Sequence, residues 1–144
     1  MKRLALVLTA LALLGPSSSP AASDATAAGH GNGSATYAGV TCNAPVAITF
    51  VVRASAAVIS DTWGAGTTPA ACTPVGGVMV AGSSALSQSG STYTAQSSYT
   101  GTDGAPMTDK VVVTVQSNRL VYSRTVTRSG IVVESASANV PRVA

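Results

Sequence analysis

From Ala47 onward, the sequence consists of short alternating or apolar runs separated by residues typical of turns. A period of two places alternate side chains on opposite faces of a β-strand. The runs predicted as strands cover residues 47–53, 57–63, 75–81, 91–100, 110–116, 119–128 and 131–138. Because no helical pattern separates them, we predict an all-β fold, a small antiparallel β-sandwich or barrel. The sequence leaves those two alternatives open.

Turn residues favour a meander at the C-terminal end of the chain. The segment 102–106 contains Asp-Gly and Pro, 117–118 is a short reversal, and Ser129-Gly130 is a hairpin candidate. We therefore expect the last three strands to be antiparallel neighbours. Serine, threonine, glycine, alanine and valine dominate the composition, which suits strands and tight turns better than helices.

The N-terminus resembles a cleavable signal peptide over residues 1–21. Met1-Lys2-Arg3 is positively charged, and Leu4–Leu14 is an apolar run of eleven residues. As a helix this run would rise only about 16 Å, too short to cross a bilayer. Small residues then allow cleavage after Ala21, or alternatively after Ala27. We expect a secreted, extracellular protein with no membrane association once the signal is removed.

The predicted domain organisation follows from where apolar periodicity begins. Residues 22–34 are rich in glycine, alanine and serine and lack a hydrophobic period, so we predict a flexible leader there. Residues 35–144 are predicted to form a single β domain. Its size limits the buried surface, and a covalent cross-link would add stability.

Cys42 and Cys72 are the two cysteines of the chain. In an exported protein such a pair most often forms a disulfide. Closing this loop is worth about 3–4 kcal/mol in the chain-entropy model. Thiol ligation of a metal is the weaker alternative, because the sequence has no second Cys or His cluster to complete a site.

The charge of the chain excludes one class of partner. The formal net charge of the chain is +3, and the mature segment is only weakly positive. Nucleic-acid binding usually needs a dense basic patch, so we expect no nucleic-acid partner.

Several short motifs resemble a known group of proteins. They are Tyr37-Ala38-Gly39, the run AITFVV at 47–52, the cysteine spacing, and SGSTYTAQSSYTGTDG at 89–104. Together they resemble small, uncharacterised secreted β-domain proteins of actinobacteria, over about residues 34–128. The chain departs from the pattern at Ala35, where the group has glycine. The resemblance implies the fold and the compartment, and it implies no activity.

Residues for catalysis are few. His30, the only histidine, lies in the predicted leader, and a hydrolytic triad needs a base held beside its nucleophile. Asp61, Asp103 and Asp109 are the candidates for a carboxylate pair of the kind that hydrolyses glycosides. Asp103 also suits a turn and Asp109 a strand edge. We expect no cofactor, and a non-enzymatic role is favoured.

Cleavage after Ala27 would create one metal-binding possibility. The new N-terminus would be Ala28-Gly29-His30, whose amine, two amides and imidazole can surround Cu(II) or Ni(II) in a plane. The alternative is a lone histidine in a leader segment.

Two sets of side chains are candidates for surface recognition. Aromatic residues stack on sugar rings or anchor protein partners, and the candidates are Trp63, Tyr93, Tyr99 and Tyr122. The second set is basic and lies on one predicted hairpin, comprising Lys110, Arg119, Arg124 and Arg128. These residues suit an anionic glycan or wall polymer, and core packing and strand-edge protection are the respective alternatives.

Three functional hypotheses follow. The leading one is a secreted, non-enzymatic binding or interaction module whose partner is a glycan, a wall polymer or an extracellular protein. The second is an inhibitor of an extracellular hydrolase that inserts the loop 64–74 into an active site. The third is a small hydrolase. The sequence leaves the ligand and the oligomeric state open.

Overall fold

The computed structural model describes residues 20–67 and 72–143. The predicted signal peptide lies almost entirely outside these ranges. Within them the chain is all-β, with nine strands in one antiparallel sheet. The elements are β1 (Ala25–Tyr37), β2 (Val40–Arg53), β3 (Ala56–Trp63), β4 (Gly77–Ala81), the 3-10 turn η1 (Ser83–Ala85), β5 (Leu86–Ser89), β6 (Thr92–Thr100), β7 (Pro106–Val115), β8 (Arg119–Arg128) and β9 (Ile131–Val143).

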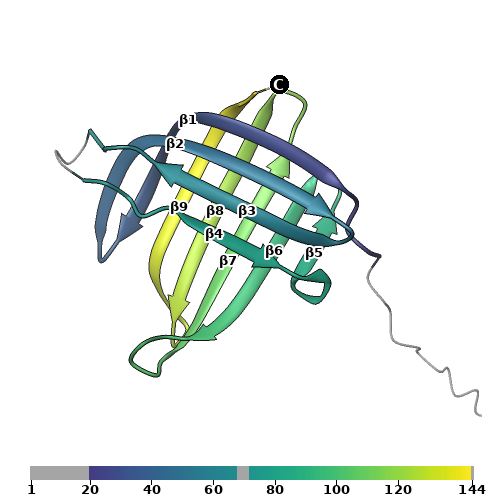
Figure 1. Cartoon of the computed structure of the whole chain (residues 1–144). Coiled ribbons are helices and arrows are strands. Elements are labelled where there is room, and N and C mark those ends of the chain that lie inside the picture. Colours follow the sequence, from purple (N-terminus) through teal and green to yellow (C-terminus); the bar gives the residue numbers. More distant parts are fainter. Residues whose placement is uncertain (1–19, 68–71, 144) are drawn as a thin grey trace, which may run out of the picture.

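The sheet folds over on itself into a nearly closed barrel of two layers. Its strand order is β4-β3-β2-β1-β9-β8-β7-β6-β5. Figure 1 shows β1 to β4 crossing in front of β5 to β9. The β1–β9 pairing joins the layers on one side, and on the other side the edge strand β4 contacts β6 of the opposite layer. The predicted meander of the last three strands is confirmed.

Strict alternation along the strands builds the core. In β2, every second residue from Cys42 to Val52 is buried. Phe50 meets Tyr93 of the opposite layer, with ring centroids 4.9 Å apart. Such tilted aromatic pairs add to the stabilisation from burial itself. The largest fully buried side chains are Tyr122, Phe50, Ile48, Leu120, Val52, Val111, Val113 and Val140.

Two-residue turns connect several of the strands. The predicted Ser129-Gly130 hairpin is confirmed, and both residues have positive φ, 49° and 80°. Ala38-Gly39 joins β1 to β2 in the same way. Positive φ at both central residues matches the twist of antiparallel strands. The predicted loop between β6 and β7 is also present, and the Asp103 carboxylate accepts a hydrogen bond from the Ala105 amide, 3.2 Å away.

The prediction of a flexible leader over residues 22–34 is wrong. Strand β1 begins at Ala25, pairs with β2 along its whole length and also pairs with β9. Its glycines face inward, where larger residues do not fit. A Cβ on Gly29 would lie 2.7 Å from Val140 Cγ2, and one on Gly33 would lie 2.8 Å from the Trp63 ring. The small residues of β1 therefore give the sequence no hydrophobic period, and in the structure they permit close packing.

The residues before β1 close one end of the barrel. Ala22 is buried, and its carbonyl accepts a hydrogen bond from Ser55. The Ser23 amide donates to Gln88 Oε1 at 2.7 Å, and the Ala54 amide donates to Asp24 Oδ1 at 2.9 Å. Cleavage after Ala21 would leave these contacts intact, whereas cleavage after Ala27 would remove them.

We expect a chain beginning at Ala28 to be less stable than one beginning at Ala22. The shorter chain loses the buried Ala22 and Ala27 and the hydrogen bonds made by residues 22–24. At about 1 kcal/mol per hydrogen bond, the free energy of unfolding should fall by roughly 2–4 kcal/mol. Urea denaturation of the two chains measures the difference. Equal midpoints would show that this segment does not hold the barrel end.

Candidate functional site

One part of the barrel interior carries charged side chains. Asp61 on β3 and Asp109 on β7 are each only 6% exposed, and the Arg124 side chain on β8 is 17% exposed. The alternation of each strand points these side chains inward. Burying a charge is unfavourable unless it is paired and hydrogen-bonded.

Arg124 pairs with both carboxylates and thereby links the two layers. Its Nε and Nη2 donate to Asp109 on the neighbouring strand, with Nε–Oδ1 3.0 Å and Nη2–Oδ2 2.6 Å. Its Nη1 lies 3.6 Å from Oδ1 of Asp61, which belongs to the opposite layer. The Asp109 hydrogen bond raises the pKa of Arg124 further above its usual range, so the guanidinium remains charged.

Further hydrogen bonds hold Asp61 in place. Trp63 Nε1 donates to its Oδ2 at 2.5 Å, and the Gly77 amide donates to its Oδ1 at 3.2 Å. A Cβ on Gly77 would lie 2.5 Å from Arg124 Nη1. This glycine therefore lets the β4 backbone approach the guanidinium. We define Asp61, Asp109 and Arg124 as the ionic cluster.

Tyr122 lies beside the ionic cluster on the inner face of β8. It is 1% exposed, and its hydroxyl has no hydrogen-bond partner among the described residues. Burial and the nearby Asp61 carboxylate raise the pKa of this phenol above its usual range, which keeps it protonated.

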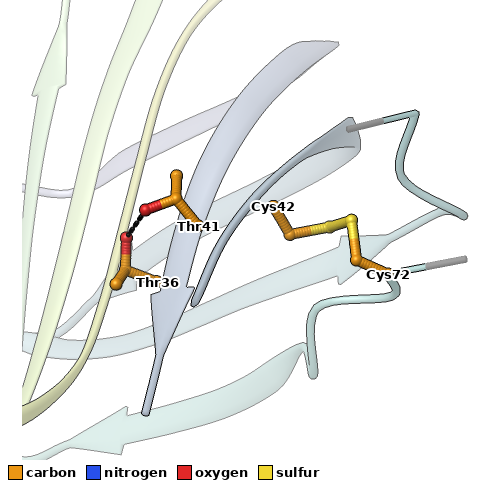
Figure 2. Close-up of a disulfide and its surroundings, with 4 residues drawn as sticks. All are labelled: Thr36, Thr41, Cys42 and Cys72. Carbon is orange, nitrogen blue, oxygen red and sulfur yellow. Dashed lines mark hydrogen bonds between the residues drawn. A yellow bond between two sulfur atoms is a disulfide. The ribbon is translucent and has the colours of Figure 1, made fainter. Parts of the chain in front are cut away.

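A pocket of about 570 Å³ opens at the same end of the barrel. One wall is the β1–β2 hairpin, and the other is the segment 72–75 that leads into β4. The predicted disulfide between Cys42 and Cys72 is confirmed and joins the two walls, with Cα atoms 5.9 Å apart. Figure 2 shows this bond, together with the 2.9 Å hydrogen bond between Thr36 and Thr41 across the hairpin. We call this the mouth pocket; its lining is Ala35, Thr36, Tyr37, Ala38, Val40, Cys42, Cys72, Thr73, Pro74, Val75 and Glu134.

Glu134 is the one charged residue in that lining. It lies on β9, directly opposite Tyr37 of β1. It also pairs with Val126, which pairs with Asp109, so Glu134 and Asp109 share one row across the sheet. Burial raises the pKa of the half-buried Glu134 carboxyl above its ordinary value of 4.5. The mouth pocket therefore combines apolar walls with a single carboxyl group.

The raised pKa of Glu134 predicts a stability effect that depends on pH. Above pH 4.5 the unfolded chain loses this proton before the folded chain does, so this group lowers stability as pH rises through the raised pKa. Glu134→Gln removes that cost. We expect the variant to gain stability relative to the wild type as pH rises from about 4 to 7. Urea denaturation across this range tests the expectation, and a difference that is constant or falls with pH would contradict it.

The structure does not support a shared aromatic binding face. Trp63, Tyr93 and Tyr122 are 8%, 5% and 1% exposed, because they fall on inward positions of β3, β6 and β8. Tyr99 is 48% exposed and lies near the end of β6. Trp63, Tyr93 and Tyr122 therefore follow the core-packing alternative, and Tyr99 is the exposed member of the four candidates.

The basic residues of the predicted hairpin are also separated in the structure. Arg124 belongs to the ionic cluster inside the barrel, and Arg128 forms an ion pair with Asp103 at the rim. Arg119 lies at the other end of β8, about 30 Å from Arg128, and donates to Asn139. Lys110 is exposed, and the ion pairs found among the described residues include neither Lys110 nor Arg119. These residues do not form one patch for an anionic polymer.

His30 lies in β1 with its side chain exposed. The preceding residues, Ala28 and Gly29, pair with both β2 and β9. A planar metal site built on their amides would require this part of the strand to unpair. Within residues 20–67 and 72–143, no cluster of three or more potential metal ligands is found.

The carboxylates proposed for hydrolysis are placed differently from a catalytic pair. Asp61 and Asp109 come together, but both are buried against Arg124. Asp103 pairs with Arg128 outside the barrel.

The inhibitor hypothesis concerns the loop 64–74, of which residues 68–71 lie outside the described ranges. The described flanks are bound to the barrel, since Thr67 N donates to Asn43 O at 3.0 Å.

A second hollow of about 760 Å³ is larger than the mouth pocket. It lies where the pairing of β1 with β9 is interrupted between Gly29 and Gly33. Its lining has neutral polar groups such as Asn32, Asn43 and Asn139 and contains no charged residue. Unlike the mouth pocket, it is lined by none of the exposed large hydrophobic side chains.

Comparison of the chain with protein-family models, curated proteins and solved structures finds no match. No helix in the described ranges has the length and apolar character to span a membrane. The fold alone defines the class of this protein, which is a small antiparallel β-barrel with one disulfide.

Proposed function

We propose that this chain is an exported, non-enzymatic binding protein that holds a small ligand with an apolar body in the mouth pocket. The observation that carries the proposal is the pocket itself, about 570 Å³ between two walls joined by the Cys42–Cys72 disulfide. Ligand pockets of this size are usually apolar with few polar groups. A disulfide is also typical of proteins that function in oxidising compartments.

The mouth pocket exposes apolar side chains that a folded protein normally buries. Tyr37, Val40 and Val75 are 69%, 55% and 78% exposed, and all three line the pocket. A bound apolar group would remove this surface from water, at about 25 cal/mol per Å². In the leading hypothesis from the sequence, the binding site was a β surface; we now place it at one end of the barrel.

A neutral fluorescent probe tests this proposal without involving charge. The oxidised chain beginning at Ala22 is titrated with N-phenyl-1-naphthylamine, and saturable binding is expected. Val75→Asp places a charge in the pocket wall and should weaken binding about tenfold or more. Val78→Asp is the matched control, because Val78 is also exposed, at 67%, but lies outside the pocket lining.

The proposal predicts that the control binds the probe as the wild type does. Absence of saturable binding to the wild-type protein would refute it. Equal weakening by both variants would also refute it, because it would place the probe elsewhere.

A further inference from the structure

Negative charge predominates around the inner end of the mouth pocket. Three carboxylates, those of Asp61, Asp109 and Glu134, lie near one guanidinium, that of Arg124. Arg124 is engaged by both aspartates. Arg128, at the end of the neighbouring strand β8, is already paired with Asp103.

Glu134 is the carboxylate of this set that faces the pocket. The ion pairs found within the described residues do not include it. A half-buried carboxylate without a charged partner is unfavourable when ionised. A cationic ligand would supply the missing partner, whereas an anionic ligand would be repelled.

An aromatic ring stands directly opposite this carboxylate. Tyr37 is the cross-strand partner of Glu134, so their Cβ atoms are about 4.5–5.5 Å apart. Tyr37 is 69% exposed and lines the same pocket. A carboxylate beside an aromatic face is a favourable environment for an ammonium group, since the ring face attracts cations.

We infer that the mouth pocket selects ligands that carry an alkylammonium group, with the cation between Glu134 and Tyr37 and the apolar chain against Val40 and Val75. This inference rests on the proposed function and specifies the ligand chemistry of the same pocket. The ionic cluster behind Glu134 strengthens the preference, because its two aspartates exceed its single arginine.

Three probes with the same apolar chain distinguish the contribution of charge to the affinity from that of apolar contact. The oxidised protein is titrated by calorimetry at pH 7 with n-octylammonium chloride, 1-octanol and sodium octanoate. Octylammonium should bind about tenfold or more tightly than octanol, which corresponds to one charge-assisted contact. Octanoate should bind more weakly than octanol.

Variants then assign the preference to the two residues. Glu134→Gln should bring the affinity for octylammonium to within about twofold of the affinity for octanol. Tyr37→Leu keeps an apolar wall and should weaken octylammonium binding about two- to fivefold. Asp24→Asn is the control, because it removes one negative charge near the opposite end of the barrel, where Asp24 contacts Ala54, and it should change nothing.

The outcomes distinguish this inference from the proposed function. Equal affinity for octylammonium and octanol, tightest binding of octanoate, or no effect of Glu134→Gln would overturn the ammonium preference alone. Failure of all three probes to bind would refute the proposed binding function as well.

Discussion

Arg124→Met is expected to lower the free energy of unfolding by about 3–5 kcal/mol, the usual cost of removing one partner from a buried ion pair. The methionine fills a similar volume but leaves Asp61 and Asp109 buried without their cation. Asp61 keeps its hydrogen bonds from Trp63 and Gly77, whereas Asp109 loses the guanidinium that approaches both its oxygens. The unpaired Asp109 should therefore account for more of the lost free energy of unfolding than Asp61 does.

Two further variants show whether burial accounts for this loss. Arg128→Met removes a guanidinium whose side chain is 52% exposed and paired with Asp103, so it should cost no more than about 1 kcal/mol. Combining Arg124→Met with Asp109→Asn should recover part of the loss, because one unpaired buried charge is removed. Chemical denaturation measures all three. An Arg124→Met loss no larger than that of Arg128→Met would contradict the structural role of the ionic cluster.

Removing the disulfide is expected to cost about 3–4 kcal/mol in the chain-entropy model. The bond joins residues separated by 30 positions, so its absence increases the conformational freedom of the unfolded chain. In the folded protein it also attaches the segment 72–75 to β2. The double variant Cys42→Ala/Cys72→Ala should therefore be less stable than the oxidised wild type and should bind N-phenyl-1-naphthylamine more weakly.

Reduction of the wild-type protein provides an independent comparison. Dithiothreitol should shift the urea midpoint of the wild type toward that of the double-alanine variant and leave the variant itself unchanged. A difference of less than about 1 kcal/mol between oxidised and reduced wild type would mean that the loop closure contributes little to stability.

The strands with large alternating apolar residues were predictable. Strands β7 and β8 carry Val111, Val113, Leu120 and Tyr122 on the inner face, so their period is clear in the sequence. The first half of β2 and the whole of β1 were not predicted, because their inward residues are mainly cysteine, alanine and glycine. Small inward residues produce no hydrophobic period, although they pack closely here. Strand β5, only four residues long, was missed as well.

The candidate site was less predictable than the fold. Arg124 alternates in phase with Leu120, Tyr122 and Val126, so the sequence did carry a signal that this arginine points inward. The pairing of Tyr37 with Glu134 joins residues almost a hundred positions apart, and no local pattern specifies that register. The mouth pocket could therefore be identified only from the structure, in which β1 pairs with β9.

Chemical-shift mapping by nuclear magnetic resonance tests the location of the binding site most directly. The oxidised, ¹⁵N-labelled chain beginning at Ala22 is titrated with n-octylammonium chloride, and backbone amide shifts are followed. The structure predicts that the largest changes fall in residues 35–42, 72–75 and 133–135, around the mouth pocket. Shifts concentrated instead around Asn32, Asn43 and Asn139 of the second hollow, or no saturable shifts at all, would contradict a binding site at the mouth of the barrel.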